Sequence, residues 1–196
     1  MNTPPETKRL FVAIDPPESV RVVLSELPER LRGVSWTPTH QLHLTLRFMG
    51  EVPVEALDRI DAALAGIRVE PFILPVAGVG AFPPDRPPRV LWVGTRAGHP
   101  RLHQLRQRVD DALLGAGLSG LDVRVFHPHF TLGRCGVGSS PGAVAGFLKK
   151  HRDFEGPAFR VEAFTLYASR LTADGAVHTP LLSVPLTASA SAADPR

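Results

Sequence analysis

Two short segments of the chain repeat one combination of reactive side chains, His43-Leu44-Thr45-Leu46 and His129-Phe130-Thr131-Leu132. On a β-strand, residues two apart share a face, so each segment presents an imidazole and a hydroxyl together. The intervening residues are apolar and point the other way, toward a core. The composition of the chain gives only roughly 0.08 chance copies of this pattern. Two copies therefore indicate a functional site.

The residue types in this pattern suit chemistry at phosphorus. Imidazole titrates near neutral pH, so one of two histidines can be protonated while the other is neutral. Such a pair can supply a general acid and a general base to the same reaction. The hydroxyls of Thr45 and Thr131 can donate hydrogen bonds to the non-bridging oxygens of a phosphate held between the imidazoles. The pattern favours in-line displacement at phosphorus, with no metal ion or other cofactor required.

Other interpretations stay open at this point. His127 and His129 have a spacing that a metal ion can use, which makes a metal-dependent hydrolase one alternative. A non-catalytic module that captures phosphorylated RNA ends with the same pocket is a second. In a third, the motifs are coincidental: both motif histidines are structural, and Thr45 and Thr131 are ordinary strand formers.

The basic side of the charge balance consists mainly of arginine. The net charge is +3, and only Lys8, Lys149 and Lys150 are lysines among the 22 basic residues. The planar guanidinium suits phosphate, so this bias is compatible with a phosphate-bearing partner. A genome rich in G and C produces the same bias, and the sequence does not separate the two causes. The excess is too small for a protein that coats polyanions in general.

Cys135 is the only cysteine, which excludes an intramolecular disulfide and a cysteine-based zinc site and favours ordinary packing. The first nine residues lack the apolar segment of a signal peptide, and no apolar run reaches the ~20 residues of a membrane span. The sequence thus predicts a soluble, cytoplasmic monomer with no membrane association and no obligate protein partner.

Hydrophobic periodicity gives the elements that must position the two motifs. The predicted strands are Arg9–Ile14, Leu42–Phe48, Phe72–Val79, Arg89–Thr95, His129–Arg134, Arg160–Ser169 and Leu181–Leu186. The predicted helices are Val20–Leu31, ended or kinked by Pro28, a second from about Pro53 to Ile67, a third with the stripe Leu102–Leu113, and Ala143–Lys150.

Each half of the chain thus contains a strand, a long helix and a motif strand. This arrangement predicts an α+β fold: a bilobal, pseudo-duplicated domain in which two antiparallel sheet lobes line a central cleft and helices cover the outer faces. The predicted domain spans residues 9–186. Residues 1–8 are expected to be flexible, and the Ala/Ser-rich residues 187–196 to form a disordered tail.

Several stretches of the chain resemble a known family. RLFVAI near the start, LHLTLRFMGEV, VGAFPP with the following RPPRVLWVG, and HPHFTLGR occur in the order and spacing of the 2H phosphoesterases. The chain is most similar to their RNA 2',3'-cyclic phosphodiesterase branch, whose members are also called 2'-5' RNA ligase-like proteins. The resemblance extends from about Arg9 to Leu186 and is most specific at the paired His-x-Thr-x motifs.

This resemblance implies an activity and a role for each motif residue. The implied reaction converts the 2',3'-cyclic phosphate of RNA 3' ends, or of nucleotides, to a 2'-phosphate. His43 matches the general acid that protonates the leaving 3' oxygen, and His129 matches the general base that activates water. Thr45 and Thr131 match the hydroxyls that hold the phosphate. In reverse, the same groups could join a cyclic end to a 5'-hydroxyl through a 2'-5' linkage.

The resemblance also bears on residues around the motifs. Arg134 matches a basic position near the phosphate or ribose, although strict strand alternation places it on the core face, as it does Phe48. Phe11 is expected either to form a base-stacking platform beside the His43 strand or to pack in the core. The branch often has a tyrosine where this chain has His178, which leaves a stacking role there open. His40 and His178 are predicted to be solvated or in loops.

Overall fold

The computed structural model describes residues 5–84, 86–96, 99–119, 125–172 and 175–188. Residues 1–4 and 189–196, which belong to the predicted flexible ends, lie outside the described residues. The first strand nevertheless begins at Thr7, earlier than the apolar run suggests, because Thr7 and Lys8 pair with Pro53 and Val52.

The described strands are β1 (Thr7–Ile14), β2 (Val34–Trp36), β3 (Leu44–Pro53), β4 (Phe72–Ala77), β5 (Val79–Phe82), β6 (Val90–Gly94), β7 (His129–Cys135), β8 (Glu155–Val161), β9 (Ala163–Thr172) and β10 (Gly175–Pro185). The helices are α1 (Glu18–Ser25), α2 (Leu57–Ala65), α3 (Pro100–Gly115) and α4 (Pro141–His151), with 3-10 turns η1 (Thr39–Gln41) and η2 (Val54–Ala56).

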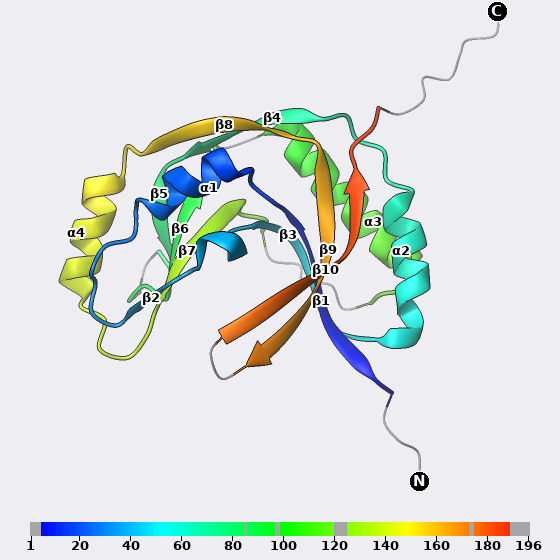
Figure 1. Ribbon diagram of the computed structural model, residues 1–196, viewed down its shortest axis with the longest axis horizontal. Helices are drawn as coiled ribbons and strands as arrows, with labels where there is room; N and C mark the ends of the chain where they lie inside the picture. Colours follow the sequence, from blue (N-terminus) through cyan, green and yellow to red (C-terminus); the bar gives the residue numbers. More distant parts are fainter. Residues whose placement is uncertain (1–4, 85, 97–98, 120–124, 173–174, 189–196) are drawn as a thin grey trace, which may run out of the picture.

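Eight strands form one antiparallel sheet in the order β10-β9-β1-β3-β7-β6-β5, with β2 paired to β7. The two halves of this sheet meet where Leu44 of β3 pairs with Phe130 of β7. Figure 1 shows β9 and β10 on one side of this junction and β5, β6 and β7 on the other. Strands β4 and β8 form a separate two-stranded sheet. The α+β prediction is confirmed, and the structure adds that the two lobes share one sheet.

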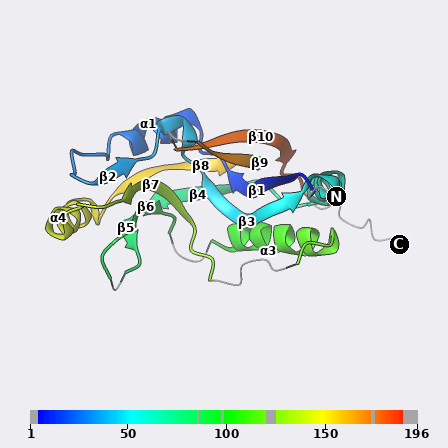
Figure 2. The same cartoon turned by 90° about the horizontal axis from the view of Figure 1, so that it is seen from below.

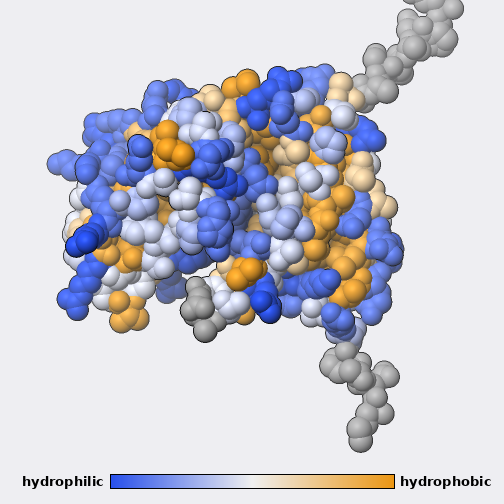
Figure 3. Space-filling view, in the orientation of Figure 1, coloured by the Kyte–Doolittle hydropathy of each residue, from blue (hydrophilic) through white to orange (hydrophobic). Residues whose placement is uncertain are grey.

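The helices bury their apolar stripes against a common core. In α3, the predicted residues Leu102, Leu105, Val109 and Leu113 are all fully buried. This helix lies along β3, as Figure 2 shows, while α4 lies at the opposite end of the molecule from α2 in Figure 1. On the surface in Figure 3, apolar residues gather over the half that contains β10 and α2, and hydrophilic residues dominate the other half.

Two predicted strands are each divided, and in both cases the chain passes between the two sheets. The run Phe72–Val79 splits at Gly78, whose φ of 77° lies in the left-handed region that favours glycine. The run Arg160–Ser169 splits at Glu162, so that β8 pairs with β4 while β9 pairs with β1. Periodicity cannot reveal these breaks, because an apolar residue stands on each side of both.

Strand β3 contains a β-bulge at the last residue of its motif. In the pairing of β1 with β3, the partner residues jump from Thr45 to Arg47, which leaves Leu46 as an extra residue. Leu46 and Arg47 are both buried, and Phe48 is 53% exposed. The bulge shifts the alternation by one residue, so the prediction that Phe48 faces the core is wrong.

Strand β7 contains the same bulge at the equivalent place. In the pairing of β6 with β7, the partner residues jump from Thr131 to Gly133, and Leu132 is the extra residue. Leu132 and Gly133 are buried and Arg134 is exposed. Strict alternation therefore fails for Arg134 as well, and Phe48 and Arg134 occupy equivalent positions in the two lobes.

Candidate active site

Both motif histidines are held in the same way. His43 directly precedes β3, and its Nδ1 lies 2.7 Å from the carbonyl oxygen of Gln41. His129 begins β7, and its Nδ1 lies 2.7 Å from the carbonyl oxygen of His127. A carbonyl oxygen can only accept a hydrogen bond, so Nδ1 donates in both cases. Nε2 is therefore the nitrogen of each ring that is left to exchange a proton with a substrate.

The turn before His43 is fixed by one arginine. Arg21 of α1 donates from Nη1 to the carbonyl oxygens of Thr39 and Leu42, each at 2.9 Å, and from Nε to that of Pro16. These bonds tie both ends of η1 to the start of α1. The Gln41 carbonyl that orients His43 thus belongs to a turn held by hydrogen bonds from Arg21. Hydrophobic periodicity does not predict such tertiary bonds.

Burial dominates the electrostatics of both histidines. Desolvation lowers the pKa of His43 to about 4, although the Gln41 carbonyl and the negative charge of Asp15 favour its protonated form. Desolvation also lowers the pKa of His129, and the nearby positive charge of Arg134 adds to this effect. Both imidazoles are therefore neutral near pH 7 when no anion lies beside them.

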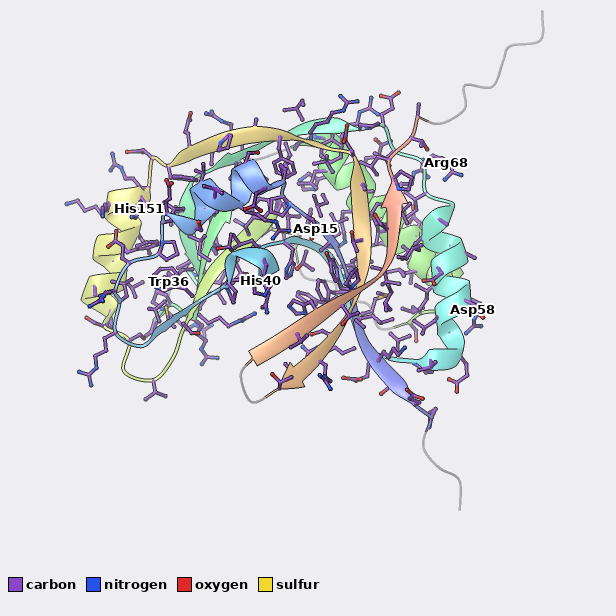
Figure 4. The ribbon with its side chains drawn as sticks, in the orientation of Figure 1. Asp15, Trp36, His40, Asp58, Arg68 and His151 are labelled. Atoms are coloured by element: carbon purple, nitrogen blue, oxygen red, sulfur yellow. The ribbon has the colours of Figure 1, made fainter. Side chains whose placement is uncertain are left out.

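A pocket of about 230 Å³ adjoins His43. It is lined by Phe11, Asp15, His40, Gln41, Leu42, His43, Tyr167, Val177 and His178. Figure 4 labels Asp15, just after β1, and His40, in η1. Tyr167 donates to Asp15 at 2.8 Å, and burial together with this bond raises the tyrosine pKa to about 12. Asp15 and Tyr167 could not be recognised as site residues from the sequence, because neither belongs to a repeated motif.

Phe11 and His178 lie against His43. The Phe11 ring is 2% exposed, and its centroid lies 4.9 Å from that of His43 and 5.1 Å from that of Tyr167. This burial makes Phe11 a support beneath the site, and its base-stacking role stays a prediction. His178 is in β10 with its ring centroid 5.4 Å from that of His43, so the prediction of a solvated or loop residue is wrong for it.

The surroundings of His129 are aromatic as well. The ring centroid of Phe82 lies 5.1 Å from that of His129, and that of Trp92 lies 6.3 Å away. Trp92 lies across the backbone of Gly80, where an added Cβ would come within 2.1 Å of the indole ring. Glycine at this position is thus required for the packing of the second lobe.

The described residues of this chain contain neither a metal-ligand cluster nor a membrane-spanning helix. Within these ranges no three His, Cys, Asp or Glu side chains are grouped as they would be around a metal ion. His127 and His129 lie with ring centroids 6.3 Å apart. None of the described helices is long and apolar enough to cross a membrane. Cys135 is a free, half-buried thiol.

Two lobes that each contribute a His-x-Thr-x motif to one antiparallel sheet define a class of phosphoesterase. Residues 14–92 and 93–178 each match the family model described as LigT like Phosphoesterase. The chain therefore belongs to the LigT-like phosphoesterase family, which confirms the resemblance found in the sequence.

Individual relatives agree with this assignment. The chain is 38% identical to an RNA 2',3'-cyclic phosphodiesterase of Aeropyrum pernix over 72% of this chain and 80% of that protein. It is 37% identical to a protein of the same name from Thermus thermophilus, over 88% and 87% of the two chains. The crystal structure of E. coli LigT with 3'-AMP superposes with a TM-score of 0.73 at 29% identity, covering 93% of this chain and 99% of LigT.

Proposed function

We propose that this protein hydrolyses the 2',3'-cyclic phosphate of RNA 3' ends, and of nucleotides, to a 2'-phosphate. The observation that carries the proposal is the matched geometry of His43 and His129, each with Nδ1 bonded to a carbonyl and Nε2 left for substrate. The names of the A. pernix and T. thermophilus relatives support the substrate class. Only RNA can form this cyclic phosphate, because the 2' hydroxyl is needed.

In the proposed mechanism, His129 accepts a proton from water as the water attacks phosphorus. His43 donates a proton to the 3' oxygen as the bond between phosphorus and that oxygen breaks, which leaves the phosphate on the 2' oxygen. Thr45 and Thr131 hold the non-bridging oxygens, and Arg134 offsets negative charge on the β7 side. No step requires a metal ion. When a 5'-hydroxyl replaces water as the nucleophile, His129 accepts its proton, the bond from phosphorus to the 3' oxygen breaks as before, and a 2'-5' linkage forms.

The lowered pKa values give this mechanism a distinctive pH dependence. Turnover requires one protonated and one neutral imidazole, and the profile of kcat/KM reports the free enzyme. Since burial depresses both pKa values, the active fraction grows as the pH falls from 7 toward 5. We therefore expect kcat/KM to rise up to about tenfold per pH unit over this range.

The measurement is a series of initial rates across pH 5–8, with circular dichroism at each pH to verify the fold. The bound phosphate carries negative charge and favours the imidazolium, so the kcat profile should lie at higher pH than that of kcat/KM. A value of kcat/KM that is constant or falls between pH 7 and pH 5, with the fold intact, would contradict the assigned roles.

The experiment that tests the function itself uses an oligoribonucleotide ending in 2',3'-cyclic phosphate, incubated with the protein in EDTA. Hydrolysis supports the proposal. A metal-dependent enzyme would lose its activity in the chelator, and an RNA-end-binding module would form a stoichiometric complex without changing the end group.

A further inference from the structure

His178 of β10 belongs to a cluster of three rings around the proposed acid. Its ring centroid lies 5.4 Å from that of His43 with the ring planes at 89°, and 4.9 Å from that of Phe11 with the planes at 77°. Phe11 and His43 also contact each other, at 4.9 Å and 34°. The hydrogen bond to the Gln41 carbonyl fixes only one atom of the His43 ring. The two ring contacts come from different directions and restrict the rotation that this bond leaves open.

The surroundings of His178 favour its neutral form. The side chain is half-buried, and its Nδ1 is buried with no hydrogen-bond partner among the residues that the structure describes. Protonation of the ring would therefore bury a charge and leave an N–H donor unpaired. Desolvation accordingly lowers the pKa of His178. The ring is thus neutral near pH 7 and gains its charge only at lower pH.

The other ionisable groups that line the same pocket offer little to offset a charge on His178. Asp15 is the acidic residue among them, and it accepts a hydrogen bond from Tyr167 and lies 3.6 Å from Nη2 of Arg21. The Arg21 cation offsets much of the carboxylate charge. Tyr167 is neutral because its pKa is raised to about 12, and His40 is an exposed residue that can add only positive charge.

We propose that His178 is a positioning residue for His43: its ring holds the imidazole in the orientation for proton donation, and its protonated form opposes protonation of His43. The inference rests on the proposed function, in which His43 must carry a proton to donate it. Two imidazolium rings with centroids 5.4 Å apart repel each other. A neutral His178 therefore favours the reactive state, and a charge on this residue limits the active fraction at low pH.

The test uses two variants that separate the ring from its charge. His178→Phe keeps a ring beside His43 and removes the charge, whereas His178→Ala removes both. At pH 7–8, His178→Phe is expected to keep kcat within about threefold, and His178→Ala to lower it roughly tenfold through misorientation of the acid. As the pH falls from 7 to 5, kcat/KM of His178→Phe is expected to rise roughly 3- to 10-fold relative to that of the unmodified protein, because only the unmodified protein gains the opposing charge.

His103→Phe is the matched control, because it makes the same substitution at an exposed histidine away from both motifs. Its kcat/KM relative to the unmodified protein is expected to be the same at every pH. Initial rates are measured across pH 5–8 on an oligoribonucleotide ending in 2',3'-cyclic phosphate, and circular dichroism verifies the fold of each variant. A relative kcat/KM of His178→Phe that does not change with pH, or full kcat in His178→Ala, would overturn the positioning role while the proposed function stands. Absence of turnover by the unmodified protein would instead reject the proposed function, and this inference with it.

Discussion

Replacement of His129 or His43 with alanine is expected to lower kcat for cyclic-phosphate hydrolysis by roughly 10²- to 10⁴-fold. Each change removes one proton-transfer group from a reaction in which the two act together. Because they act as a unit, the double variant is expected to be little worse than either single variant. The measurement is single-turnover hydrolysis of a labelled oligoribonucleotide with a cyclic end.

The control for these variants is His103→Ala. His103 is an exposed histidine of α3, away from both motifs, and its ring contacts only Phe126 among the ring contacts found in the described residues. This variant is expected to keep full activity. Circular dichroism and thermal unfolding must show that all four variants are folded. If a folded His43→Ala or His129→Ala protein retained more than a tenth of the original kcat, the two-histidine mechanism would be wrong.

The second large effect is expected on stability, in Asp110→Ala. Asp110 accepts hydrogen bonds from Arg47 and Arg106, and these bonds hold its pKa below the usual value against the opposing effect of burial. Removal of the carboxylate leaves Arg47 buried without this partner. Breaking a buried pair in this way costs about 3 kcal/mol or more of the free energy of unfolding. For a chain of this length, the melting temperature is expected to fall by roughly 6–12 °C.

Urea denaturation and calorimetry measure this loss, and Asp111→Ala is the matched control. Asp111 is the next residue of α3 and is exposed, where it accepts a hydrogen bond from Gln107. Its replacement is expected to change the free energy of unfolding by less than about 0.5 kcal/mol. Equal stability of the Asp110 and Asp111 variants would show that the buried pair does not hold β3 to α3.

Much of the fold follows from patterns that are local in sequence. The stripe from Leu102 to Leu113 predicts α3, and the alternation around Leu44 and Phe130 predicts the two motif strands. The pairing of one strand with another is not local, so the single sheet that joins the lobes at these two residues could not be derived from periodicity. The same is true of β2, a three-residue strand that exists through its pairing with β7.

The candidate site was predictable where it is repeated. The two His-x-Thr-x copies are visible in the sequence, and in each copy the histidine Nδ1 donates to the carbonyl oxygen of the residue two positions earlier. Residues that reach the site through tertiary contacts could not be predicted in this way: Tyr167 and His178 come from strands far along the chain, and Arg21 acts through the backbone. Phe48 was misplaced because a bulge changes the alternation without any change in residue type.

The phosphate position on the product tests the central claim most directly. The protein is incubated in EDTA with an oligoribonucleotide ending in 2',3'-cyclic phosphate, and the product end is identified by mass spectrometry and by resistance or sensitivity to a 3'-specific phosphatase. We predict complete conversion to a 2'-phosphate, and conversion by the double variant of His43 and His129 that is slower by at least roughly 10²-fold. A 3'-phosphate product would contradict the assignment of His43 to the leaving 3' oxygen, and an unchanged cyclic end would contradict the proposed function.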